Sequence, residues 1–165
     1  MFCPFFNYEK KIAKILTEKK LTVSTAESCT GGLISSVLTD VSGSSSFVLS
    51  NLVTYSNEAK KKFLKVEAET LEKFGAVSAQ TAKEMAEGIF FLANTSIGLS
   101  ITGIAGPLGG SKEKPVGLAY VGLKSEKALF TEKILLPKFL PRKFMKYCFA
   151  KIALYELLKF IERNF

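Results

Sequence analysis

TAESCTGG, from Thr25 to Gly32, is the stretch around which this chain is organised. It follows the β-branched run of residues 21–24 and precedes apolar residues at helical spacing over residues 33–38. A strand that leads through hydroxyls, a thiol and two glycines into a helix places small reactive side chains at a helix N-terminus, where unpaired N–H groups favour negative charge. The glycines also let a ligand or a developing oxyanion approach the backbone closely. The simpler interpretation is an ordinary strand-to-helix turn that Ser28 or Thr30 caps.

The order of the expected elements predicts an α/β fold. The periodicity predicts strands over residues 21–26, 47–55, 97–102, 116–123 and 128–136, and helices over residues 8–19, 31–39, 58–64, 67–74, 78–93 and 141–161. We therefore expect one domain over residues 1–165, a three-layer α/β/α sandwich with a mixed, mostly parallel sheet of about five strands. The last helix is apolar over more than one stripe, which predicts that it packs on both the sheet and a partner subunit.

The composition is that of an ordinary globular protein, with 47% hydrophobic and 23% charged residues. The formal net charge of +8 favours anionic partners: a phosphate-bearing small molecule, nucleic acid or an acidic surface. The basic residues lie in short clusters, and no helix-turn-helix, zinc-ligand or RNA-binding pattern accompanies them. These absences count against nucleic acid and leave the other anionic partners open.

Histidine is absent, which excludes Ser-His, Cys-His and imidazole–metal chemistry. The three cysteines, Cys3, Cys29 and Cys148, lack metal-ligand spacing, and reduced thiols in a cytoplasmic protein are the simple account. Residues 1–6 show no signal-peptide pattern. Residues 88–111 carry no charge and resemble a membrane span in length, but the polar break at residues 94–96 and the glycine-rich end predict a buried helix end, a turn and a buried strand instead.

A serine nucleophile without histidine needs a lysine as its base. Lys60 is the best candidate, because it lies one turn into the helix that follows Tyr55, whereas Lys61 and Lys62 point around the helix toward solvent. Polar segments follow three expected strands, at residues 27–32, 55–60 and 102–110, and the carboxyl ends of parallel strands are where such sheets bind ligands.

Cys29 could be the nucleophile instead, in a set with Lys60 and either Glu27 or Glu58. A buried, inert thiol is the simpler interpretation of this cysteine.

The chain resembles the CinA C-terminal-domain family in a series of blocks that keep the family's order and span nearly the whole sequence. These blocks are TAESCTGG at residues 25–32, GSS at 43–45, VTYSNEAK at 53–60, GAVS at 75–78, TGIAGP at 102–107 and GGSKEKPVG at 109–117. The family includes amidases that hydrolyse nicotinamide mononucleotide to nicotinate mononucleotide and ammonia. The resemblance implies a Rossmann-like α/β/α domain of the stand-alone form, a homodimer, and no metal or organic cofactor.

Carried over by position, the resemblance implies Ser28 as nucleophile and Lys60 as general base. It suggests a proton relay through Ser45, and a role for Tyr55 in orienting Lys60 or hydrogen-bonding the amide. Backbone N–H groups near residues 30–32 would hold the oxyanion, and Arg142 suits a bidentate phosphate contact. The residues expected to bind substrate are Glu27, Cys29, Thr30, Gly31, Gly32, Thr102, Gly103, Gly106 and Arg142.

Two positions depart from the family's pattern. Leu108 stands where the loop often carries an acid, and Leu140-Pro141 stands where a glycine and an aspartate usually precede the arginine. Because of these departures, a family member that binds a nucleotide without hydrolysing it stays an alternative function for this chain. The charge and the family's association with competence and DNA damage keep open a nucleic-acid-binding module.

Overall fold

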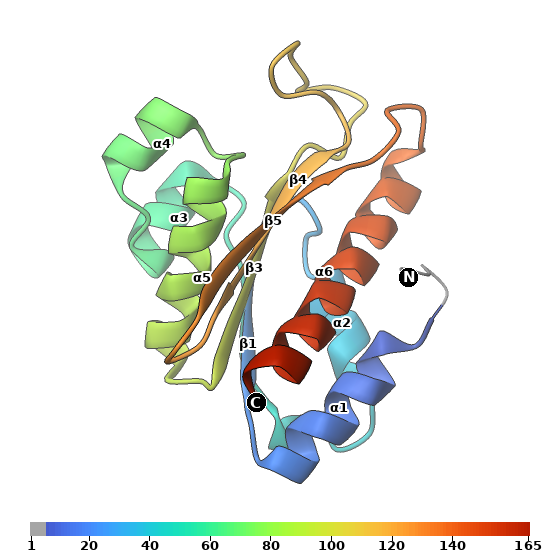
Figure 1. Cartoon of the computed structure of the whole chain (residues 1–165). Coiled ribbons are helices and arrows are strands. Elements are labelled where there is room, and N and C mark those ends of the chain that lie inside the picture. The colour runs from blue at the N-terminus through green and yellow to red at the C-terminus, as the bar shows by residue number, and fades with distance from the viewer. Residues whose placement is uncertain (1–5) are drawn as a thin grey trace.

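A five-stranded mixed sheet, in the order β2-β1-β3-β4-β5, forms the centre of the computed structural model, which describes residues 6–165 (Figure 1). The strands are β1 (Val23–Glu27), β2 (Val48–Val53), β3 (Ile97–Gly103), β4 (Leu118–Lys124) and β5 (Leu129–Leu135). β1 is parallel to both β2 and β3, whereas β4 is antiparallel to β3 and β5. Four of the five strands therefore run in one direction, which confirms the predicted mixed, mostly parallel sheet.

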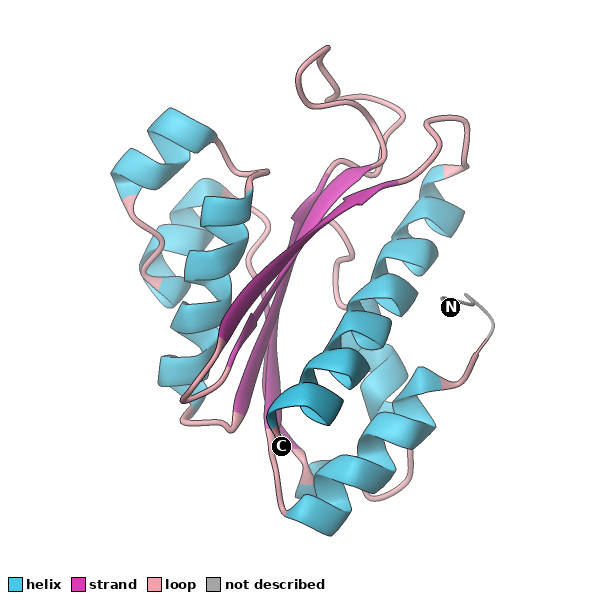
Figure 2. Ribbon diagram, in the orientation of Figure 1, coloured by secondary structure: helices cyan, strands magenta, loops and turns pink. Residues whose placement is uncertain are grey.

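Two groups of helices cover the two faces of the sheet, as the ribbon in Figure 2 shows. The helices are α1 (Tyr8–Lys19), α2 (Leu33–Thr39), α3 (Asn57–Leu64), α4 (Ala68–Phe74), α5 (Ala79–Ala93) and α6 (Arg142–Asn164), with a short 3₁₀ helix, η1 (Ser44–Ser46), before β2. Helices α1, α2 and α6 lie on one face and α3, α4 and α5 on the other (Figure 1). The predicted three-layer α/β/α sandwich is confirmed. Cys3 and the rest of residues 1–5 lie outside the described residues.

The main hydrophobic core lies between the sheet and α1, α2 and α6. The second apolar stripe of α6, with Phe149 and Leu154, is buried within the chain, where α1 and α2 also pack against this helix, whereas Phe144 at its start is 39% exposed. Buried Lys151 of α6 forms an ion pair with Glu9 of α1 at 2.9 Å. That α6 also packs on a partner subunit stays a prediction.

Local interactions fix the helix ends on the α3–α5 face. Ser56 accepts a hydrogen bond from the N–H of Ala59, and Ser78 accepts one from the N–H of Thr81, so both act as N-caps. Gly75 ends α4 with a φ of 71°, a conformation that glycine adopts without strain. The cap of α2 differs from the prediction, since Gly32 and not Ser28 or Thr30 holds the N-cap position.

The long uncharged stretch of residues 88–111 forms the end of α5, a turn and the buried strand β3, as predicted. None of the helices within residues 6–165 combines the length and the hydrophobicity that crossing a bilayer requires.

Candidate functional site

The carboxyl ends of β1, β2 and β3 meet at one edge of the sheet because the three strands are parallel. Ser28 directly follows β1, Thr54 and Tyr55 follow β2, and the loop from residue 104 follows β3. The N–H of Thr54 donates to the carbonyl of Glu27, and the N–H of Ser28 donates to the carbonyl of Ile101, so these chain ends are tied together. The structure thus brings the three predicted polar segments to one place.

Lys60 and Ser28 lie in direct contact at this edge. The first turn of α3 directs the Lys60 side chain into the protein, where it is 1% exposed, and its Nζ lies 3.1 Å from the Ser28 Oγ. The same Nζ donates to the carbonyl oxygens of Thr54 at 2.8 Å and Tyr55 at 3.3 Å. A neutral amine has two N–H groups and one lone pair. With both N–H groups directed at the two carbonyls, the lone pair faces the Ser28 hydroxyl, which is the arrangement a general base needs.

Burial lowers the pKa of Lys60 from 10.5 to about 8, because the charged ammonium loses its hydration. Among the described residues, no carboxylate lies within ion-pair distance of its Nζ. Lys61 and Lys62, the next residues of α3, are exposed. Of these three lysines, only Lys60 is buried in contact with Ser28.

Cys29 is buried beside Ser28, and its environment makes it a poor nucleophile. Burial is the largest effect and raises the pKa of the thiol to about 12, and the nearby carboxylate of Glu27 also raises it. A thiol with this pKa stays protonated at neutral pH, and the protonated form is not the attacking species. The contact of Lys60 with Ser28 and the raised pKa of the Cys29 thiol together favour the serine over the cysteine.

Glu27 is fully buried and its carboxylate holds the start of α2 in place. It accepts hydrogen bonds from the N–H groups of Gly32, Ile34 and Ser35 and from the hydroxyls of Thr30 and Ser35, at 2.5 to 3.1 Å. A carboxylate at a helix N-terminus satisfies the unpaired N–H groups there and interacts favourably with the helix dipole. Glu27 and Thr30 thus maintain the turn that presents Ser28, rather than facing the cavity.

Two of the three N–H groups predicted to hold an oxyanion are already engaged. The N–H of Gly31 donates to the Ser28 carbonyl at 3.1 Å, and that of Gly32 donates to Glu27. No hydrogen bond to a neighbouring residue occupies the N–H of Cys29 or Thr30 within the part of the chain that the structure describes. The N–H that follows a nucleophilic serine is a common oxyanion donor, so Cys29 and Thr30 replace the glycines as candidates.

A cavity of about 200 Å³ opens next to this turn. Its lining comes from the ends of β1, β2 and β3 and from the start of α6: Cys29, Tyr55, Gly103, Ile104, Ala105, Gly106, Leu108, Gly109 and Arg142. The Arg142 guanidinium donates to the carbonyl of Gly106 at 2.6 Å and to the hydroxyl of Tyr55 at 3.1 Å. The Tyr55 ring is therefore held by Arg142, while its backbone carbonyl, and not its ring, contacts Lys60.

The loop after β3 shapes the cavity through its backbone. Gly106 has a φ of +69°, which favours glycine, and an added Cβ would lie 2.5 Å from Val116. Gly103 packs against Ala119 in the same manner. The Thr102 hydroxyl is buried and donates to the carbonyl of Ala76, so it ties β3 to the segment after α4. Leu108, the position that departs from the family's acid, is exposed at the cavity rim.

Ser45 lies far from Ser28 within the chain, which corrects the expected relay. It belongs to η1, three residues before β2 begins, and Val48 at that end pairs with Val23 at the start of β1. Ser28 follows the other end of β1, so the length of the strand separates the two serines. Ser45 is also exposed. A relay between Ser28, Ser45 and Lys60 of one chain is not formed.

Lys146 is a site residue that the sequence reasoning missed. Its Nζ approaches the N-terminal turn of α2 so closely that a Cβ added to Gly31 would lie 3.3 Å from it. No carboxylate pairs with it anywhere in residues 6–165. Its spacing in the sequence could have indicated it, because Lys146 lies four residues after Arg142 on α6 and therefore on the same face of the helix.

The hydroxyl of Thr54 is a second polar group near Ser28 to which the sequence analysis assigned no role. Its buried hydroxyl is the single side-chain polar atom without a hydrogen-bond partner among the buried atoms of the described residues. A bound substrate or water commonly satisfies such a group.

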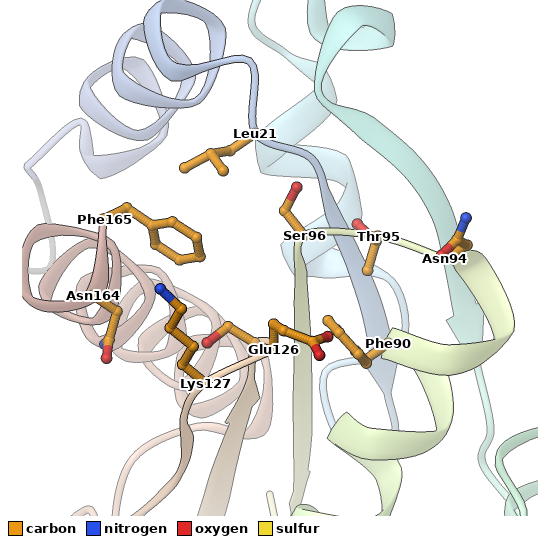
Figure 3. Close-up of a pocket in the computed structure, with 10 residues that line it drawn as sticks. Leu21, Phe90, Asn94, Thr95, Ser96, Glu126, Lys127, Asn164 and Phe165 are labelled. Atoms are coloured by element: carbon orange, nitrogen blue, oxygen red, sulfur yellow. The ribbon is translucent and has the colours of Figure 1, made fainter.

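A second cavity, of about 400 Å³, lies at the opposite end of the sheet, between α5, the β4–β5 turn and the end of α6 (Figure 3). Phe90, Phe165 and Leu21 give it an apolar lining, and Glu126 and Lys127 lie at its side. No serine or cysteine there contacts a lysine amine. The contact between Ser28 and Lys60 thus lies near the smaller cavity and not near this one.

Comparison with known proteins gives a consistent result. Residues 6–161 match the sequence model of a family described as the CinA C-terminal domain. A crystal structure of the competence/damage inducible protein CihA from Agrobacterium tumefaciens is 40% identical, with a TM-score of 0.88 over 96% of this chain and 97% of that one. The competence damage-inducible protein A of Klebsiella pneumoniae is 29% identical, with a TM-score of 0.91 over 96% of this chain and 97% of that one.

Relatives from Alkaliphilus oremlandii and Clostridium acetobutylicum carry the name of a competence-damage inducible protein. They are 58% identical over 115 residues and 55% identical over 129 residues, which is 70% and 78% of this chain. The matched part is 28% and 31% of those relatives' length, so the chain spans less than a third of each.

Proposed function

Since the chain belongs to the CinA C-terminal domain family, we propose that it is an amidohydrolase that converts nicotinamide mononucleotide to nicotinate mononucleotide and ammonia. The observation that carries the proposal is the contact between the Ser28 Oγ and the Lys60 Nζ, whose other hydrogen-bond partners are two backbone carbonyls. The family's amidases supply the substrate class by resemblance.

The reaction divides into two steps. In the first, Lys60 takes the Ser28 hydroxyl proton while the Oγ bonds to the carboxamide carbon. The tetrahedral intermediate then collapses, its C–N bond breaks, and the amide nitrogen leaves as ammonia with the proton that Lys60 carried. In the second step, Lys60 takes a proton from water, the hydroxide attacks the acyl-enzyme, and Ser28 is released with its proton restored. The N–H groups of Cys29 and Thr30 are the oxyanion donors in both steps.

Positive charge beside the cavity suits a phosphorylated substrate. Arg142 lines the cavity, and Lys146 approaches the turn that carries Ser28. Guanidinium groups bind phosphate through paired N–H donors, and an ammonium acts as a point charge. Placing the carboxamide at Ser28 would leave the phosphate for Arg142 and Lys146.

Ammonia release from nicotinamide mononucleotide tests the proposal, with purified wild type beside the Ser28→Ala and Lys60→Ala variants. Wild type should release ammonia, and each variant should lose at least about 100-fold in kcat/KM. Cys29→Ala is the matched control, because it alters the neighbouring side chain and leaves the proposed nucleophile intact. Activity that survives in Ser28→Ala would exclude the serine mechanism, and absence of release by folded wild type would exclude the substrate.

A binding module for nucleic acid is the second candidate, favoured by the net charge of +8 and by the names of the relatives. Titration with duplex DNA at increasing salt distinguishes it. A nucleic-acid-binding module would bind tightly, with an affinity that falls steeply as salt rises.

A further inference from the structure

The side-chain hydroxyl of Thr54 is enclosed by the protein but has no hydrogen-bond partner within residues 6–165. Thr54 is 1% exposed. The buried hydroxyls of Ser100 and Thr102 on β3, by contrast, each donate to a backbone carbonyl. An enclosed hydroxyl without a partner has lost its hydrogen bonds to water and has gained none in return. Such a group in a native fold commonly marks the place of a bound ligand or water molecule.

The backbone of Thr54 joins the chain end that carries the nucleophile to the base. Its N–H donates to the carbonyl of Glu27, the residue before Ser28. Its own carbonyl accepts a hydrogen bond from the Lys60 Nζ at 2.8 Å, and that Nζ lies 3.1 Å from the Ser28 Oγ. The hydroxyl without a partner thus belongs to a residue that already contacts the proposed base.

The side chain of Thr54 faces the same side of the sheet as α3. The preceding residue, Val53, faces α2, because its Cγ2 lies 3.8 Å from where a Cβ added to Gly32 would lie. Successive side chains of an extended chain point to opposite sides, and the N–H of Thr54 continues the pairing of β2 with β1. Thr54 therefore points to the side from which α3 directs Lys60 toward Ser28.

The proposed reaction needs a polar group beside Lys60 in both of its steps. In acylation, Lys60 gives its proton to the amide nitrogen, the C–N bond breaks and ammonia leaves. In deacylation, a water molecule takes the place of ammonia, gives a proton to Lys60 and bonds through its oxygen to the acyl carbon. The leaving nitrogen and the attacking oxygen therefore occupy one place, within reach of the Lys60 Nζ. A hydroxyl both donates and accepts, so it suits both occupants.

We propose that the Thr54 hydroxyl holds the amide nitrogen of the substrate during acylation and the attacking water during deacylation. This role rests on the proposed amidase function and narrows its substrate class. Thr54 and Lys60 are each 1% exposed, so the protein closes around the place where the nitrogen leaves. An –NH₂ group or a water molecule fits there, whereas a substituent on the nitrogen does not. The site accepts primary carboxamides and rejects N-substituted ones.

Substitutions of Thr54 test this role through the formation of nicotinate mononucleotide and the thermal midpoint. Thr54→Val keeps the shape and removes the hydroxyl, so kcat/KM should fall at least about tenfold while the midpoint stays within about 2 °C of wild type. Thr54→Ser restores the hydroxyl and should return kcat/KM to within about threefold of wild type. Thr95→Val is the matched control, because the buried Thr95 hydroxyl donates to Thr22 at the opposite end of the sheet. This control should keep its activity and lower the midpoint by about 2–5 °C.

A second substrate tests the enclosure of the leaving group. The N-methylcarboxamide analogue of nicotinamide mononucleotide gives the same carboxylate product, so the two amides are compared in one assay. Wild type should favour the primary amide at least about 100-fold in kcat/KM. Thr54→Ala removes the hydroxyl and the methyl group and leaves space for the added methyl of the analogue. It should reduce the preference at least about tenfold.

The outcomes separate the role of Thr54 from the amidase proposal. Full activity in Thr54→Val, or equal rates of wild type on the two amides, would overturn the role of Thr54 and leave the amidase proposal standing. A midpoint that falls in Thr54→Val as far as its activity does, with no recovery in Thr54→Ser, would assign Thr54 to stability instead. Absence of product from wild type would overturn the amidase proposal and the role of Thr54 with it.

Discussion

The pH dependence of ammonia release offers the sharpest test of Lys60 as the base. A pKa of about 8 leaves about 1% of Lys60 neutral at pH 6, about 10% at pH 7 and about half at pH 8. If only the neutral amine accepts the Ser28 proton, kcat/KM should rise about 50-fold from pH 6 to pH 8 and level off above pH 9. Initial rates of ammonia release from nicotinamide mononucleotide across this range measure the profile, with Ser28→Ala as the blank.

The same titration should appear in stability, with a sign that the lowered pKa determines. Between pH 8 and pH 10.5 the unfolded chain keeps the Lys60 proton and the folded chain has lost it, so wild-type stability gains with rising pH in that window. Lys60→Met lacks this contribution. Its stability relative to wild type should therefore fall by up to about 3 kcal/mol across the window, measured by urea unfolding. In the rate measurement, a kcat/KM that does not change between pH 6 and pH 8, or that still rises at pH 10, would refute the assignment of Lys60 as the base.

Three substitutions examine neighbouring groups. Cys29→Ala should keep kcat/KM within about threefold of wild type, because a thiol with a pKa of about 12 is not the nucleophile. A loss of kcat/KM above about 100-fold would instead identify the thiol as the attacking group. Glu27→Gln should lower the thermal midpoint by about 5–15 °C, because an amide has one acceptor oxygen and cannot accept the hydrogen bonds that now reach both carboxylate oxygens. An unchanged midpoint in calorimetry would contradict the role of Glu27 in holding the start of α2. Lys146→Met should raise KM for nicotinamide mononucleotide about tenfold while sparing the unphosphorylated riboside, and the exposed Lys143→Met should change neither. Equal losses on both substrates would remove Lys146 from phosphate binding.

Much of the fold follows from local patterns. The caps at Ser56 and Ser78 and the glycine at residue 75 depend on interactions within a few residues, so the sequence predicts them directly. The buried strand β3 and the alternation of strands with helices follow from apolar periodicity. The site motif likewise depends on two short segments that follow neighbouring parallel strands.

Other features depend on residues far apart in the sequence. The second apolar stripe of α6 is buried by α1 and α2, and periodicity cannot say which element covers a stripe. The hydrogen bond from the N–H of Gly32 to the Glu27 carboxylate was not predicted either. Any nearby acceptor can cap a helix, whereas the sequence pattern for an N-cap points to hydroxyl side chains such as Ser28 and Thr30.

The amino-acid order alone specified the α/β/α class and the pair of residues that meet, Ser28 and Lys60, because both depend on local periodicity and on motifs of a few residues. The fold was needed to show that Lys60 is buried, that two carbonyls orient its amine, and that Ser45 lies at the opposite end of the sheet. The physical reason is that solvent exclusion and hydrogen-bond direction arise from packing between distant segments. A lysine in a sequence has the pKa of a solvated amine until the surrounding structure removes its water.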